Sequence, residues 1–292
     1  MAGIRVGLAG LGVMGWRIAK NLRDAGLLVG VYNRTFDKAL KFSRDYGVEA
    51  FRTPGELARA SDVVITMLSD DEAVRSVIAG SDGVLSGLRL GSLVIDMSTI
   101  SPSVSIELAN MVRSRGGDMV DAPVIGTSVA VERKELVVLV GGSEDAFNRA
   151  RDILQHTAKT IIHVGPNGYG LYAKLINNAL LGSYVVALAE VVQLGRAFGL
   201  SDSVILDVLT KLSSARSPTS ELKVPKMLSG DYSVQFALKH MRKDLDIVNR
   251  EASMRGVPIP MASLALQFYR MAERMGLSEE DFAAVLKVLI RQ

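Results

Sequence analysis

A regular alternation of strand-like and helix-like segments constrains the fold of this chain more than any other feature. From residue 4 to about 163, short apolar runs rich in β-branched residues alternate with amphipathic segments of helical length. This alternation is typical of a parallel sheet covered by helices, so we predict an α/β Rossmann-type doubly wound sheet. Strands are expected at 5–9, 28–32, 63–67, 93–96, 119–122, 136–140 and 161–164. Helices are expected at 16–24, 35–46, 54–60, 71–78, 102–114 and 143–155.

The second half of the chain has a different pattern. Beyond the turn-rich joint Gly165-Pro166-Asn167-Gly168 the strand patterns stop, which predicts a Rossmann domain at 1–165 and an all-α domain at 166–292. Its helices are expected at 169–198, 203–211, 234–255, 261–275 and 280–291. The first of them is apolar on nearly all sides, so its own domain, the neighbouring domain or a partner subunit must cover it.

Composition excludes several classes of function. The 34 basic and 31 acidic residues are interspersed and give a net charge of only +3, so neither nucleic acid nor a membrane surface is an expected partner. Lys174 and four other polar residues interrupt the apolar run before it reaches the length of a membrane span. The chain has no cysteine, its three histidines lack metal-type spacing, and its first residues enter a strand at once. We therefore expect a cytosolic protein without a metal site.

A glycine motif marks a nucleotide site. Gly10-x-Gly12-x-x-Gly15 follows the strand that ends at Ala9 and opens the next helix. The first glycine permits a tight turn, the second lets backbone N–H groups approach a pyrophosphate, and the third allows close packing of helix and strand. The motif in this context predicts a dinucleotide site. Its loop comprises Gly10, Leu11, Gly12, Val13, Met14 and Gly15.

The end of the second strand indicates which dinucleotide binds. An NAD enzyme usually has Asp or Glu there for the ribose 2′-hydroxyl, whereas this chain has Asn33-Arg34-Thr35. Arg34 offers a planar cationic fork and Thr35 a hydroxyl, and no carboxylate repels a 2′-phosphate. We predict NADP as the cofactor; the alternative is that Arg34 is only a solvated charge after a strand.

These residues, with four later segments, resemble the β-hydroxyacid dehydrogenase family, which includes 3-hydroxyisobutyrate dehydrogenases and small semialdehyde reductases. The similarity spans nearly the whole chain. The matching segments are Gly7-Leu-Ala-Gly-Leu-Gly-Val-Met-Gly15, Asp96-Met-Ser-Thr-Ile-Ser-Pro102, Asp121-Ala-Pro-Val124, Lys174-Leu-Ile-Asn-Asn178 and Lys243-Asp244.

The resemblance implies further site residues and an assembly. Leu68 and Ser69 would border the adenosine side of the cofactor, Thr99 would lie by the nicotinamide, and Lys243 would close over the cofactor from the helical domain. Ser98 would join the substrate-binding residues. The family also implies a long interdomain helix, a homodimer or homotetramer, and a small carboxylate substrate.

Lys174 is the candidate catalytic residue. A helical lysine in an apolar segment usually buries its stem and extends its ammonium to water, and helix position alone favours that behaviour here. Asn178 is four residues on and therefore shares its helix face. The resemblance reverses the preference, because the family's catalytic lysine begins this Lys-x-x-x-Asn unit. It implies that Lys174 is the general acid and base and that Asn178 orients it or binds the substrate.

The substrate segment departs from the family pattern. Relatives have Ser-Gly-Gly after Asp-Ala-Pro-Val, whereas this chain has Ile125-Gly126-Thr127. Gly126 and Thr127 can still offer backbone N–H groups to a carboxylate, but Ile125 makes the pocket more apolar. A second departure is Lys134-Glu135-Leu136, where relatives usually have a Gly-Thr-Leu-like unit.

The predicted activity is NADP-dependent hydride transfer to or from a small 3-hydroxy acid, similar to 3-hydroxyisobutyrate or serine, or the corresponding semialdehyde. Two alternatives stay open. One is a semialdehyde, glyoxylate or imine reductase on the same scaffold, and the other is a non-catalytic NADP-binding assembly module. Lys174 argues against the imine reductase and the binding module, because both usually lack the lysine.

Overall fold

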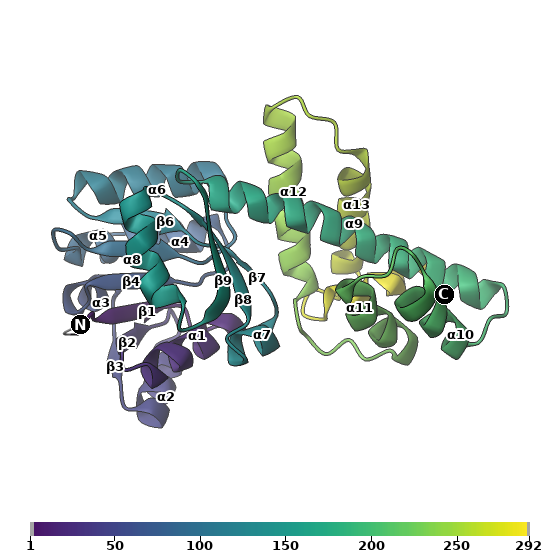
Figure 1. Cartoon of the computed structure of the whole chain (residues 1–292), viewed down its shortest axis with the longest axis horizontal. Coiled ribbons are helices and arrows are strands. Elements are labelled where there is room, and N and C mark those ends of the chain that lie inside the picture. Colours follow the sequence, from purple (N-terminus) through teal and green to yellow (C-terminus); the bar gives the residue numbers. More distant parts are fainter. Residues whose placement is uncertain (1–2, 291–292) are drawn as a thin grey trace. The chain divides into compact units, whose positions relative to one another are not determined.

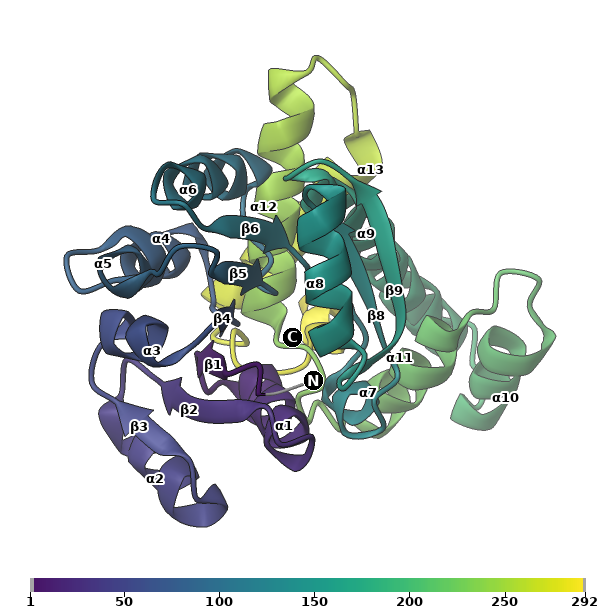
Figure 2. The same cartoon turned by 60° about the vertical axis from the view of Figure 1, so that its left-hand side comes forward.

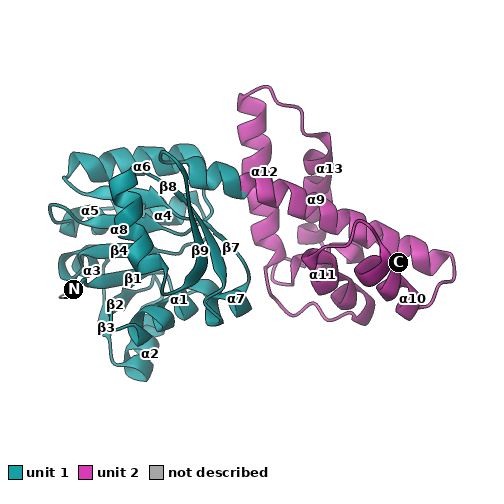
Figure 3. Cartoon of the chain, in the orientation of Figure 1, with its two compact units in different colours: residues 1–174 teal, residues 175–292 magenta. Residues whose placement is uncertain are grey.

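Two units make up the chain in a computed structural model that describes residues 3–290 (Figure 1). Unit 1 comprises Met1–Lys174 and unit 2 comprises Leu175–Gln292, as the two colours of Figure 3 show. The division falls inside one long helix, α9 (Tyr169–Ala197), whereas the sequence-based boundary at 165 precedes that helix.

Unit 1 contains one nine-stranded sheet. Six neighbouring strands are parallel in the order β3-β2-β1-β4-β5-β6, and β8 continues the sheet antiparallel to β6, with β7 and β9 paired to β8. This is the strand order of a dinucleotide-binding doubly wound sheet, so the predicted fold class is confirmed. The strands are β1 (Val6–Ala9), β2 (Leu28–Tyr32), β3 (Glu49–Phe51), β4 (Val63–Thr66), β5 (Leu93–Asp96), β6 (Asp118–Asp121), β7 (Val124–Ile125), β8 (Leu136–Gly141) and β9 (Ala158–Gly165).

Helices cover the sheet of unit 1 on both faces, and Figure 2 shows the sheet with its helices from a second direction. They are α1 (Val13–Asp24), α2 (Phe36–Tyr46), α3 (Pro54–Ala60), α4 (Asp71–Ala79), α5 (Val84–Gly87), α6 (Pro102–Ser114), α7 (Ser128–Glu132) and α8 (Glu144–Leu154).

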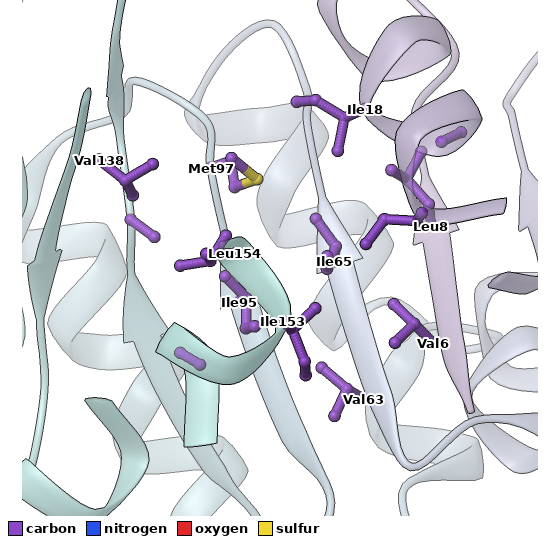
Figure 4. Packing of buried hydrophobic residues seen from close by; sticks show 14 of the residues in the cluster. Val6, Leu8, Ile18, Val63, Ile65, Ile95, Met97, Val138, Ile153 and Leu154 are labelled. Carbon is purple, nitrogen blue, oxygen red and sulfur yellow. The ribbon is translucent and has the colours of Figure 1, made fainter. Parts of the chain in front are cut away.

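Alternate residues of each strand bury against opposite helix layers. Ile65 and Ile95 join the core beneath α1, α2 and α8, whereas Val64 and Val94 join the core beneath α3, α4 and α6. Figure 4 shows Ile153 of α8 beside the side chains of the first of these cores. Burial of both faces explains why the strands read as continuous apolar runs in the sequence.

Unit 2 is helical. Its core comprises apolar residues of α9 and of the helices that follow it. These are α10 (Asp202–Asp207), the π-helix η1 (Val208–Leu212), α11 (Pro218–Ser229), α12 (Leu238–Met254), α13 (Pro260–Arg274) and the 3-10 helix η2 (Phe282–Leu289). By length and composition alone α9 could also cross a membrane, but 44% of its most apolar window is buried inside the protein.

Several elements differ from the sequence-based expectation. The pattern predicted no helix between 211 and 234, yet α11 lies there, with Pro225 in its interior. Ser217 caps its start and Pro218 is its first residue, and a Ser-Pro pair of this kind is a helix-start signal that the sequence did contain. The expected helix at 234–255 begins only at Leu238, and the last expected helix is a 3-10 helix whose predicted end, Arg291, lies outside the described residues.

Candidate active site

The glycine-rich loop between β1 and α1 fits the pyrophosphate of a dinucleotide. Gly10 has φ +107°, and a Cβ there would lie 2.3 Å from the Met67 carbonyl oxygen. A Cβ on Gly15 would lie 1.9 Å from the Gly10 carbonyl oxygen, so α1 packs directly against the loop. A Cβ on Gly12 would meet nothing within 4 Å. Open space therefore borders Gly12 at the N-terminus of the 12-residue helix α1, where the motif binds a pyrophosphate.

The other three loop residues have different environments. Leu11 is buried, Met14 packs against the core of unit 1, and Val13 is 57% exposed. The loop therefore presents backbone and one exposed apolar side chain to solvent, while its neighbours hold it in place.

Asn33 fixes this loop to the end of β2. Its Oδ1 accepts a hydrogen bond from the Leu11 N–H at 2.9 Å, and its Nδ2 donates to the Thr35 carbonyl oxygen at 2.9 Å. Arg34 and Thr35 are exposed, and the Thr35 side chain makes no capping hydrogen bond to α2. Asn33 is therefore a positioning residue, and Arg34 and Thr35 are accessible to a ligand.

Ser98 connects the carboxyl ends of β4 and β5. Its hydroxyl accepts the Leu68 N–H at 2.9 Å, and its own N–H donates to Asp96 Oδ1 at 3.1 Å. It is 1% exposed, whereas Thr99 beside it is half-buried and Ser69 is exposed. Ser98 thus has a structural contact in addition to the substrate-binding role that the resemblance implies.

The predicted substrate segment lies in a short hairpin next to α7. Ile125 pairs with Val137 of β8, and Gly126 follows with φ +137°. A Cβ on Gly126 would lie 2.8 Å from Leu136 Cδ2, so only glycine fits there without rearrangement. Thr127 precedes α7 and makes no side-chain cap, which leaves its hydroxyl available. At the other end of the hairpin, Lys134 has φ 58° and is the one non-glycine with positive φ among residues 3–290.

Two side chains of α1 hold α7 in place. The Arg17 guanidinium donates to Glu132 Oε1 at 2.6 Å, and the buried amide of Asn21 donates to the Val131 carbonyl oxygen at 2.8 Å. Neither residue belongs to a sequence motif, so its contact with α7 becomes visible only in the structure. These contacts connect the segment proposed for the substrate to the helix that follows the glycine loop.

Asp121 anchors the beginning of α9 to the end of β6. Its two carboxylate oxygens accept the N–H groups of Gly168 at 2.6 Å and Leu171 at 3.0 Å. Burial raises the pKa of this carboxyl to about 6, although the two backbone hydrogen bonds oppose the rise. Gly170 has to be small, because a Cβ there would lie 2.4 Å from the Leu139 carbonyl oxygen. Lys174 follows Leu171 by three residues and is 9% exposed.

Two other candidates lie in unit 2. The Asn178 amide donates to Asp244 Oδ2 at 2.6 Å, and its Oδ1 accepts from Asn177 at 2.9 Å. Lys243 Nζ lies 3.2 Å from Asp244 Oδ1. Asn178 is fully buried, so its polar atoms serve a network within this unit.

Unit 1 therefore gathers most of the candidate residues at one edge of its sheet. The glycine loop, Arg34, Leu68 and Thr99 all follow the carboxyl ends of neighbouring parallel strands, which is where doubly wound sheets bind ligands. Asp121 is a further functional candidate, and its sequence signal is an acidic residue at the end of a buried strand.

Comparisons with known proteins agree with this architecture. Residues 5–165 match the family model described as the NAD binding domain of 6-phosphogluconate dehydrogenase. Residues 168–289 match the one described as NAD-binding of NADP-dependent 3-hydroxyisobutyrate dehydrogenase.

Relatives are similar over nearly their whole length. The chain is 36% identical over 286 residues to 2-(hydroxymethyl)glutarate dehydrogenase of Eubacterium barkeri, covering 98% of this chain and 94% of the relative. It is 36% identical over 291 residues to the mitochondrial 3-hydroxyisobutyrate dehydrogenase of Mus musculus, covering 97% and 86%. The structure of the Mycobacterium tuberculosis 3-hydroxyisobutyrate dehydrogenase with L-serine has a TM-score of 0.88 and 31% identity, covering 99% and 100%. This chain belongs to the β-hydroxyacid dehydrogenase family of NAD(P)-dependent oxidoreductases.

Proposed function

We propose that the protein transfers hydride between NADP and a small 3-hydroxy acid similar to 3-hydroxyisobutyrate or serine, or the corresponding semialdehyde. Lys174 is the general acid and base in this proposal. The observation that carries it is the burial of Lys174, which is only 9% exposed, on the first turns of a helix whose start Asp121 holds. Burying a lysine ammonium costs free energy, and functional sites are among the places where proteins bury ionisable groups.

The choice of NADP rests on the end of β2. Arg34 and Thr35 are exposed there, and Asn33 stands where NAD enzymes usually have an acidic residue. In the proposal the Gly10–Gly15 loop holds the pyrophosphate, Arg34 and Thr35 hold the 2′-phosphate, Leu68 and Ser69 border the adenosine, and Thr99 lies by the nicotinamide.

The proposed chemistry is a balanced proton and hydride transfer. The bound nicotinamide supplies or accepts the hydride. In reduction, the Lys174 ammonium donates a proton to the carbonyl oxygen as the C–H bond forms. In oxidation, the neutral amine takes the proton from the hydroxyl as the C–H bond breaks, and the product is the semialdehyde.

The substrate class rests on the relatives and on one local difference. Their names include 3-hydroxyisobutyrate, 2-(hydroxymethyl)glutarate and L-serine dehydrogenases, which act on small carboxylates with a hydroxymethyl group. Gly126 and Thr127 would bind the substrate carboxylate, and Ser98 would contribute from the end of β5. Ile125 favours a substrate with an apolar group beside the carboxylate.

Parallel oxidation assays with NADP and NAD test this proposal. A panel of 3-hydroxy acids is followed by the appearance of the reduced cofactor, and turnover with NADP is expected to exceed turnover with NAD. Lys174→Ala should lower kcat by about 10²–10⁴-fold while NADPH binding stays unchanged. Near-normal turnover of this variant would refute the role of Lys174.

Lys226 provides a matched control. It is also 9% exposed and on a helix, but its Nζ donates to the carbonyl oxygen and hydroxyl of Ser233 at 2.8 Å. Lys226→Ala should lower stability and leave kcat of the folded enzyme within about twofold, because it removes only structural contacts with the segment from Asp231 to Ser233.

We further propose a cytosolic homodimer or homotetramer without nucleic-acid or membrane partners. The apolar side chains of Ile176 and Leu180 on α9, and of Phe198 directly after it, are 74%, 73% and 71% exposed, and exposed apolar surface favours association. Light scattering of the purified chain tests the subunit number; a monomer at micromolar concentration would contradict it.

A further inference from the structure

Arg52 leaves the sheet next to the segment proposed to bind the 2′-phosphate. Strands β2 and β3 are parallel, and Tyr32, the last residue of β2, pairs with Phe51, the last residue of β3. The next residues, Asn33 and Arg52, therefore emerge side by side from the same sheet edge. Neighbouring strands lie about 4.8 Å apart, so the length of an arginine side chain covers the distance to the Arg34 segment.

The Arg52 side chain is held against this segment by an aromatic ring. Its Cζ lies 4.5 Å from the centroid of the Phe36 ring, and Phe36 is the first residue of α2, directly after Thr35. A guanidinium stacked on a ring is already ordered, so binding an anion costs it less side-chain entropy.

Both guanidiniums lack a carboxylate partner. Among residues 3–290, neither Arg34 nor Arg52 has an acidic oxygen within ion-pair distance. Glu49 and Glu56 lie three and four residues from Arg52 in the sequence, and neither is within ion-pair distance of its guanidinium in the described part of the chain. Glu56 instead uses Oε2 to accept the backbone N–H groups of Arg52 and Thr53 at 2.9 and 3.2 Å. Other arginines of unit 1 are paired, as Arg17 is with Glu132 and Arg75 with Glu107.

Arg52 also borders accessible space. A hollow of about 500 Å³ is lined by Phe36, Arg52 and residues of β3 and α3. Arg52 is exposed, so its guanidinium is accessible to a ligand phosphate.

We propose that Arg52 is a second cation for the 2′-phosphate of the dinucleotide, acting together with Arg34. A phosphate monoester carries nearly two negative charges and three acceptor oxygens, which two guanidinium forks satisfy better than one. The unphosphorylated ribose of NAD offers only a hydroxyl at this point. Arg52 is thus a specificity-determining residue that the glycine motif and the Asn33-Arg34-Thr35 segment do not identify. The inference rests on the proposed NADP preference.

Two nucleotides that differ only in the 2′-phosphate test it. The full chain is titrated by calorimetry with adenosine 2′,5′-bisphosphate and with adenosine 5′-monophosphate. Arg52→Gln should weaken binding of the bisphosphate by about tenfold or more and change binding of the monophosphate by less than twofold. Arg34→Gln should give the same pattern, which calibrates the effect of a 2′-phosphate contact.

Arg59→Gln is the control. Arg59 lines the same hollow but lies near the end of α3, where that helix leads back to the opposite edge of the sheet. Arg59→Gln should leave the affinities for the bisphosphate and the monophosphate unchanged. Thermal unfolding of each variant verifies that the fold is retained.

The outcomes separate this inference from the cofactor proposal. If the wild-type chain does not prefer the bisphosphate, both the NADP proposal and this inference are wrong. If the wild type prefers it and Arg34→Gln abolishes the preference, an unchanged preference in Arg52→Gln overturns this inference alone. If Arg52→Gln weakens the binding of both nucleotides equally, this inference is also overturned, because Arg52 would then act only by holding Phe36.

Discussion

The amide of Asn178 on α9 donates a 2.6 Å hydrogen bond to the carboxylate of Asp244 on α12, and both side chains are fully or almost fully buried. This pair ties the long helix to the helix that carries Lys243. An amide can donate to a carboxylate, but a second carboxylate cannot, so the polarity of position 178 matters as much as its size.

Substitutions of Asn178 test whether its amide donor is needed opposite Asp244. Asn178→Ala is expected to lower the free energy of unfolding by about 1–3 kcal/mol, because Asp244 loses a buried partner. Asn178→Asp should destabilise more at pH 8, since two buried carboxylates repel each other, and should recover as the pH falls and one of them is protonated. Thermal unfolding at pH 5.5 and pH 8 measures the difference; similar melting curves for the two variants at both pH values would contradict it.

Asp121 predicts a pH dependence of stability. Burial raises its pKa from 3.8 to about 6, so the folded protein binds this proton more tightly than the unfolded chain does. The stabilisation that follows from the raised pKa is therefore fully present below pH 4 and is lost as the pH rises through 6. The free energy of unfolding falls by about 3 kcal/mol over the whole titration.

Asp121→Asn removes this titration. Relative to that of the wild type, the free energy of unfolding of the variant should rise by about 2 kcal/mol between pH 4 and pH 6. Urea unfolding at a series of pH values measures the difference curve. A flat difference over this range would show that Asp121 does not titrate there.

Lys134 adopts a left-handed backbone conformation, with φ 58°, that favours glycine. A side chain with φ 58° costs about 1 kcal/mol, which glycine avoids at some cost in unfolded-state entropy. Lys134→Gly should therefore raise the free energy of unfolding by about 0.5 kcal/mol. Lys134→Ala retains a Cβ and should give no gain. Equal stabilisation by both substitutions would assign the effect to loss of the lysine charge instead.

A buried ion pair predicts a large loss of stability in unit 2. Lys223 Nζ lies 2.8 Å from Asp281 Oδ1, and the two side chains are 4% and 0% exposed. Lys223→Met should lower the free energy of unfolding by about 3 kcal/mol, since it leaves a buried carboxylate without its cation. Far-UV circular dichroism follows the unfolding of this helical unit.

The exposed pair Lys239–Glu279 is the control for that measurement. Its side chains are 38% and 78% exposed, so Lys239→Met should change stability by less than about 1 kcal/mol. A loss for Lys239→Met as large as that for Lys223→Met would mean that burial does not set the difference.

The sequence by itself determined the class of fold and the nucleotide loop. Period-2 and period-3.6 patterns follow from which faces of each element are buried, and they identified most strands and helices of the Rossmann domain. Gly10, Gly12 and Gly15 were readable because their role depends on the local backbone. Short elements escaped prediction, as β3 did, since three residues contain too little of any period to be recognised.

Only the tertiary structure decided which polar groups meet. It paired Asn33 with Leu11, Asp121 with the first turn of α9, and Asn178 with Asp244. It also placed Arg52 beside Asn33 through the register of β2 and β3. These partners lie 19 to 66 positions apart in the sequence, so no local pattern specifies them. Packing of the elements selects them, because each buried polar group must find a partner where the fold brings one.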